Sequence, residues 1–118
     1  MLDADELLDE AELDAEDMAR ITRDADGVRV QLLEPVTFKR TKMDEEEELA
    51  ELQLPLKVKG KHLKAMDQAV GEMGKTIALL AKLSRVPAAA FDDMDSRDIV
   101  LALEAIRPFL PKRRRTGN

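Results

Sequence analysis

The stretch with the most recognisable chemistry is residues 69–76, Ala-Val-Gly-Glu-Met-Gly-Lys-Thr. It matches a phosphate-binding P-loop if the first glycine of the motif is relaxed to alanine, with Lys75 reaching the outer phosphate oxygens. A P-loop needs a buried strand directly before it, and residues 63–68 carry polar side chains at helical spacing instead. We therefore interpret the motif as a glycine-weakened junction between helices. An enzyme whose nucleotide hydrolysis depends on Lys75 is kept as a third function, behind the two that are described below.

Two further groups could bind a cation or a proton. Calcium prefers several carboxylate oxygens, but the acidic run near the C-terminal third lacks the turn glycine and the closing glutamate of a calcium loop. We expect Asp95 to cap a helix instead. His62 is the single histidine and the chain has no cysteine, which excludes multi-histidine and thiolate metal sites within one chain. The sequence thus predicts no metal, no cofactor and no catalytic residues, and the protein is not expected to be an enzyme. The acidic run consists of Asp92, Asp93, Asp95 and Asp98.

Length and composition favour one small domain with an aliphatic core. The chain has 118 residues, of which 44% are hydrophobic and 37% charged, with three Phe and no Trp or Tyr. Domains have roughly 100–200 residues, so two full domains do not fit. No apolar stretch approaches the roughly 20 residues that cross a bilayer, and the N-terminus lacks the basic and apolar regions of a secretory signal. We expect a protein that binds no membrane and stays in the cytoplasm.

Charge is distributed unequally along the chain. The net charge is -6, but residues 1–56 hold 18 acids and 6 bases, whereas residues 57–118 hold 7 acids and 13 bases. The basic clusters have no interleaved aromatic side chains on which bases could stack, which argues against nucleic-acid binding. The alternative kept open is a regulatory nucleic-acid-binding protein whose basic half is masked by the acidic arm. The clusters are Lys57, Lys59, Lys61 and Lys64, and residues 112–115.

The N-terminal half predicts a β-hairpin. Residues 28–32 alternate apolar and polar, residues 39–48 are nearly all charged, and residues 49–54 restore alternation before Pro55. The acid-rich residues 1–27 are expected to form a flexible arm, and residues 111–118 a flexible basic tail. The single folded domain is therefore predicted over residues 28–110.

The C-terminal half predicts three to four short helices. One apolar stripe begins after Gly60 and ends where Gly71 and Gly74 weaken the helix, and a second segment covers residues 77–83. A last helix follows Asp95, with Ile99, Leu103 and Ile106 predicted in the core, and Pro108 bends or ends it. The expected fold is α+β, with the hairpin packed on the helices. The first stripe contains Leu63, Met66, Val70 and Met73.

The order of these segments resembles a known family of binding proteins. In order and spacing, the segments of residues 28–110 resemble the small tail assembly chaperones of contractile-tailed, Mu-like phages and prophages. These chaperones are of the tail protein E type. The matching segments are residues 28–36 and 52–54, Pro55 with Leu63 and Asp67, and residues 77–87, 95–99 and 105–110.

The resemblance implies a non-enzymatic chaperone in the cytoplasm of the infected host, absent from the mature virion. Such proteins bind the tape-measure protein, and in some cases tail-tube subunits, during tail morphogenesis. Their genes often encode a longer product through a programmed ribosomal frameshift. The apolar and polarizable side chains expected to contact the partner are Leu63, Met66, Val70, Met73 and Phe109.

Overall fold

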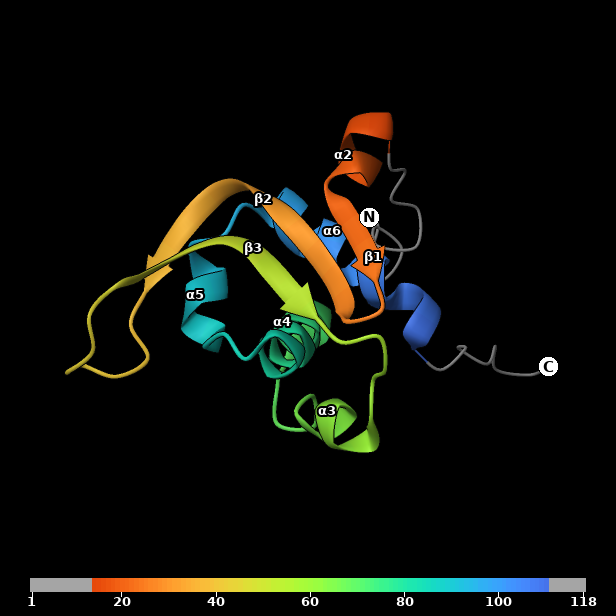
Figure 1. Cartoon of the computed structure of the whole chain (residues 1–118). Coiled ribbons are helices and arrows are strands. Elements are labelled where there is room, and N and C mark those ends of the chain that lie inside the picture. Colours follow the sequence, from red (N-terminus) through yellow and green to blue (C-terminus); the bar gives the residue numbers. More distant parts are fainter. Residues whose placement is uncertain (1–13, 111–118) are drawn as a thin grey trace, which may run out of the picture.

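A three-stranded antiparallel sheet organises the domain in the computed structural model, which describes residues 14–110 (Figure 1). The strands are β1 (Ile21–Asp24), β2 (Gly27–Phe38) and β3 (Glu47–Leu54), in the spatial order β1-β2-β3. The predicted hairpin is therefore confirmed as the β2–β3 pair. It acquires a third strand, β1, on its other side.

The alternation of β2 explains which face of the sheet is covered. Val28, Val30 and Leu32 are buried, whereas the residues between them face outward and are exposed. Successive side chains of a strand point to opposite faces, so this pattern puts one aliphatic face against the helices. The β2–β3 register is interrupted between Gln31 and Val36. Pro35, which has no backbone N–H to donate, lies within this interruption.

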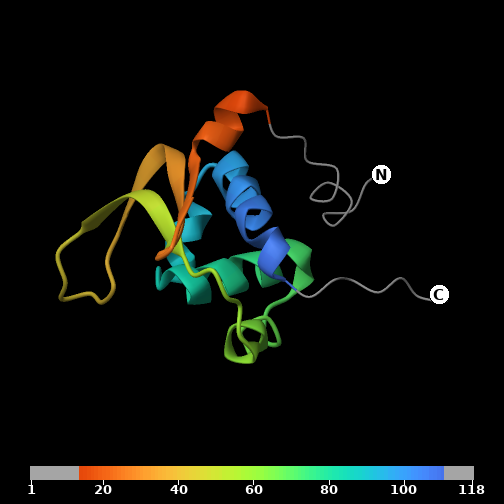
Figure 2. The ribbon, with the colours of Figure 1, turned by 45° about the vertical axis from the view of Figure 1, so that its right-hand side comes forward.

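The helices α4, α5 and α6 lie on one side of the sheet, α2 stands at the start of β1, and the tip of the hairpin extends past the helices (Figures 1 and 2). The longest helix, α4, packs on β3, and α6 packs on β2. The α6 helix is followed by one turn of 3₁₀ helix, η1, which contains Pro108. The bounds are α2 (Ala15–Ala19), α3 (Gly60–Lys64), α4 (Gly71–Ser84), α5 (Ala88–Asp92), α6 (Ser96–Ile106) and η1 (Arg107–Phe109).

The core is aliphatic except for one aromatic side chain. Phe91 of α5 is the largest fully buried residue, and it packs among leucines, valines and isoleucines from the sheet, α4 and α6. The three α6 residues predicted to be core, Ile99, Leu103 and Ile106, are all buried, so that prediction is confirmed. The α+β fold is confirmed as well. No helix in the described part of the chain is long and apolar enough to cross a membrane.

The flexible arm predicted over residues 1–27 is wrong for residues 15–24. These residues form α2 and β1. Their acid-rich composition predicted disorder, but composition gives no information about strand pairing. β1 pairs with β2 across the tight turn between Asp24 and Gly27. Residues 1–13 of the arm, and the tail at residues 111–118, lie outside the described residues.

The first predicted helix is also divided. Its apolar stripe was expected on one helix face, but α3 ends at Lys64 and α4 begins at Gly71, so the stripe spans two helices and the turns between them. Val70 has an extended backbone, and Gly71 has φ +79°, a conformation that glycine adopts without steric cost. Gly71 therefore starts a helix rather than ending one.

Candidate functional site

The exposed apolar side chains of the described domain include a group where α3 passes into α4. Val70 is 90% exposed and Met73 is 37% exposed, whereas Leu63 and Met66 are half-buried and pack against the core. We call residues 56–73 the α3–α4 corner. Four of the five predicted partner-binding residues lie in it.

A chain of turns gives the corner its shape. Met66 N–H donates to the Leu63 carbonyl at 3.0 Å, and Ala69 N–H donates to the Met66 carbonyl at 3.1 Å. These three-residue steps replace the continuous helix that the stripe predicted. Val70 then caps α4, and Met73 follows it by three residues in the first turn of that helix. The two exposed side chains thus come from one end of α4.

Phe109, the fifth predicted partner-binding residue, has contacts within the domain. It is half-buried in η1 and packs against the core. The guanidinium of Arg23 lies over its ring, 5.8 Å from the centroid, and Arg23 Nη2 also donates to the Ala105 carbonyl at 3.3 Å. A cation above an aromatic face is held by the ring's quadrupole. Phe109 therefore helps attach β1 to the end of α6.

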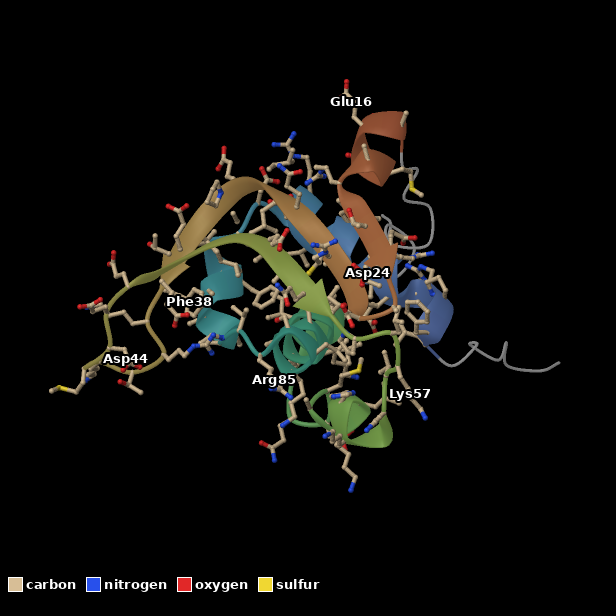
Figure 3. The ribbon with its side chains drawn as sticks, in the orientation of Figure 1. Glu16, Asp24, Phe38, Asp44, Lys57 and Arg85 are labelled. Atoms are coloured by element: carbon tan, nitrogen blue, oxygen red, sulfur yellow. The ribbon has the colours of Figure 1, made fainter. Side chains whose placement is uncertain are left out.

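The α3–α4 corner is rich in lysine. Lys57, Lys59, Lys61 and Lys64 are all exposed, and Figure 3 shows Lys57 on the segment that enters α3, away from Asp44 at the tip of the hairpin. Lys82 of α4 is close enough to α3 to act on the charge of His62. The corner is therefore an apolar surface beside a concentration of positive charge.

His62 lies among these lysines as a neutral acceptor. Its Nδ1 accepts a hydrogen bond from Lys59 N–H at 2.9 Å, across the first turn of α3. Partial burial lowers the pKa of His62 below 6.5, and the positive charges of Lys61, Lys59 and Lys82 lower it further. The imidazole is therefore neutral at pH 7.

Of the P-loop-like residues 69–76, residues 71–76 form the start of α4 and the first two precede it. The preceding segment is α3 and its turns, with no strand that could position a phosphate-binding loop. The Thr76 hydroxyl is buried and donates to the Glu72 carbonyl at 2.9 Å, one turn earlier in the same helix. Lys75 is exposed on α4. These residues agree with the prediction of a junction between helices.

Two of the four aspartates considered as a calcium loop, Asp95 and Asp98, bind different partners. Asp95 caps α6, as predicted, by accepting from Arg97 N–H at 2.9 Å, and hydrogen bonds from Arg97 lower its pKa to about 2. Asp98 points into the protein instead. Among residues 14–110, no group of three or more histidine, aspartate or glutamate side chains is arranged to hold a metal ion.

Asp98 forms a buried ion pair that the sequence analysis did not find. Its side chain is fully buried, with Oδ1 2.7 Å from Arg20 Nη1, and both carboxylate oxygens accept from Leu33 N–H at 3.0 Å. Arg20 Nη1 also donates to the Gln31 carbonyl at 3.0 Å. No local pattern indicates a contact between residues 78 positions apart. The pair joins α6 to β2 and to the residue between α2 and β1.

A shallow depression lies beside the β1–β2 turn, next to the end of β3. Its volume is about 200 Å³. Its polar groups are occupied within the turn, because Asp24 accepts from the N–H groups of Asp26 and Gly27 and from the Arg29 guanidinium. We therefore assign it a role in the turn. It is lined by Asp24, Asp26, Gly27, Val28, Arg29, Gln53 and Leu54.

Comparisons of the chain with protein-family models, with curated proteins and with solved structures found no match.

Proposed function

We propose that this protein is a phage tail assembly chaperone that binds the tape-measure protein, tail-tube subunits or both during tail morphogenesis, without catalysing a reaction. It would act in the host cytoplasm and be absent from the finished virion. The family resemblance over residues 28–110 supplies the partner. The exposed apolar surface of the α3–α4 corner supports a role in binding.

The observation that carries the proposal is the exposure of Val70 and Met73. Isolated apolar side chains are common on protein surfaces, but these two lie three residues apart where α4 begins, and they follow the half-buried Leu63 and Met66 along the chain. A long helical client exposes apolar faces before assembly. An apolar surface with flexible methionines can cover such faces without a rigid pocket.

Co-expression tests the proposal. A tape-measure segment expressed alone is expected to aggregate, because its apolar helix faces are uncovered, and to stay soluble with this chain. The soluble fraction and recovery of a complex at low salt are measured. A parallel culture expresses the segment with an unrelated small acidic protein. Unchanged solubility, with no complex formed with either tape-measure or tube protein, would contradict the chaperone assignment.

A second candidate is the regulatory nucleic-acid-binding protein, favoured by the lysines around α3. Phosphate contacts release counterions, so duplex binding would weaken steeply as salt rises. The chain lacking residues 1–13, which contain six acids and no base, is titrated with duplex DNA between low and physiological salt. A steep salt dependence in this variant would favour the second candidate over the first.

A further inference from the structure

We infer that the α3–α4 corner binds one amphipathic helix of a partner protein, with acidic residues flanking its apolar face. The inference rests on the proposed function, which requires a client-binding surface. It adds the position of that surface and the charge of the client segment.

The charge of the corner selects an acidic partner. Residues 55–82 contain six lysines and only two acids, Asp67 and Glu72. Five of the lysines, Lys57, Lys59, Lys61, Lys64 and Lys82, are exposed and belong to α3, its flanking segment or the part of α4 near His62. Charges of one sign around a binding surface raise the association rate of an oppositely charged partner and disfavour partners of the same sign.

The spacing of the apolar side chains suits a helix. Val70 and Met73 are exposed where α4 begins, and the half-buried Leu63 and Met66 precede them in the chain at spacings of three and four residues. An amphipathic helix presents apolar side chains at three- and four-residue spacing, and it docks by laying them on such a surface. Methionine adapts its shape to what it contacts. The lysines then face the polar flanks of the bound helix.

The hairpin tip gives the opposite preference and serves as an internal reference. Asp44 and the next two glutamates lie there, two more glutamates begin β3, and Met43 is 93% exposed beside them. Residues 39–48 hold five acids and three bases, so the net charge of this part of the hairpin is negative. The tip therefore combines an exposed methionine with negative charge. An acidic helix would be repelled at the tip and attracted at the corner.

Two synthetic peptides test the charge preference. Both carry the same leucine face; one has glutamates on its polar flanks and the other has lysines. We expect the glutamate peptide to bind the full chain at least about tenfold more tightly at low salt, with the difference shrinking as salt rises. Binding is followed by fluorescence anisotropy. Equal affinities, or tighter binding of the lysine peptide, would overturn the inference.

Two variants locate the binding. The Val70→Asp, Met73→Asp double variant places charge at two exposed positions, so we expect the fold to be retained, and circular dichroism checks this. The glutamate peptide should bind this variant at least about tenfold more weakly than it binds the wild-type chain. The control is Met43→Asp at the hairpin tip, for which affinity should not change. The pair Lys57→Glu, Lys61→Glu should reverse the peptide preference, whereas Lys42→Glu in the hairpin loop should not. An unchanged affinity or preference in the corner variants rejects the corner.

The co-expression assay separates this inference from the proposed function. If wild-type chain keeps the tape-measure segment soluble and the corner variants do so equally well, the chaperone role stands and the corner is not its site. If the glutamate peptide binds the corner but no tape-measure segment is kept soluble, the surface stands and the chaperone role fails. Competition by duplex DNA at equal charge concentration would show a general anion surface and overturn the helix assignment.

Discussion

At the scale of single residues, the most consequential contact is the pair of Arg20 and Asp98. Asp98 is fully buried, and its charge is compensated by Arg20 and by Leu33 N–H. A buried charge without partners is costly, whereas a paired one adds little over an apolar residue. The pair therefore matters chiefly because neither member can be removed alone.

Replacing Arg20 by alanine should destabilise the protein by about 3–5 kcal/mol, because it leaves the Asp98 carboxylate buried without its cation. Urea denaturation, followed by circular dichroism, measures the change. Arg97→Ala is the matched control. Arg97 also forms an ion pair, with Asp95, but the Arg97 side chain is 72% exposed. Equal urea midpoints for the two variants would show that the Arg20 pair contributes no more than a surface ion pair.

His62 should make stability depend on pH. Its pKa is lowered in the folded protein, so the unfolded chain takes up a proton first as pH falls. The contribution of His62 to the free energy of unfolding is therefore fully present above about pH 6.5. It decreases as the pH falls below the ordinary histidine pKa. The melting temperature is compared at pH 7.5 and 5.5. In His62→Gln this decrease should be smaller, and an identical decrease in both proteins would exclude a contribution from His62.

At the scale of elements, turns determine where strands and helices meet. Gly27 has φ +153°, and a Cβ added to it would lie 2.5 Å from the Leu54 carbonyl oxygen. This close approach lets β2 begin directly beside the end of β3. At the other end of the hairpin, Arg40 donates to the Arg85 carbonyl at 2.8 Å and to Glu47 at 2.8 Å. The hairpin is thus attached to the end of α4.

Gly27→Ala should destabilise the protein by more than about 1 kcal/mol, because the new Cβ collides with backbone in a conformation that alanine rarely adopts. Gly60→Ala is the matched substitution. Gly60 is the first residue of α3, and nothing lies within 4 Å of the Cβ that alanine would add there. Alanine there should be neutral or stabilise by up to about 1 kcal/mol. Thermal unfolding of both variants tests this, and a Gly27 variant as stable as the Gly60 variant would refute it.

At the scale of the whole molecule, the N-terminal segment divides into two parts. Residues 15–24 form α2 and β1, and Arg20 lies between them. Ile21 packs against the core. Within residues 14–27, the acids belong to α2, to β1 and to the positions that adjoin them.

Deleting residues 1–13 should leave the unfolding midpoint nearly unchanged, whereas deleting residues 1–27 should lower it strongly. The longer deletion removes β1 and leaves Asp98 without Arg20. Chemical denaturation of both truncated chains tests this. Binding experiments on the arm therefore need the shorter truncation, and similar midpoints for the two chains would show that α2 and β1 are dispensable.

The sequence by itself determined the features that depend on local periodicity and turn chemistry. These are the β2–β3 hairpin, the α6 helix with Asp95 at its cap, the buried stripe of that helix, and the α+β class. The strands and helices behind these features each follow from a pattern within about ten residues, because a strand or helix face repeats every two or 3.6 residues.

Tertiary structure decided the features that depend on distant partners. Composition predicted an arm where β1 pairs with β2, because acid content does not report pairing across a turn. The stripe over residues 63–73 predicted one helix, but an extended Val70 and the positive φ of Gly71 divide it, and this division exposes Val70. Asp98 pairs with a residue 78 positions away. Helical periodicity cannot reveal such contacts, because they depend on how the elements pack in three dimensions.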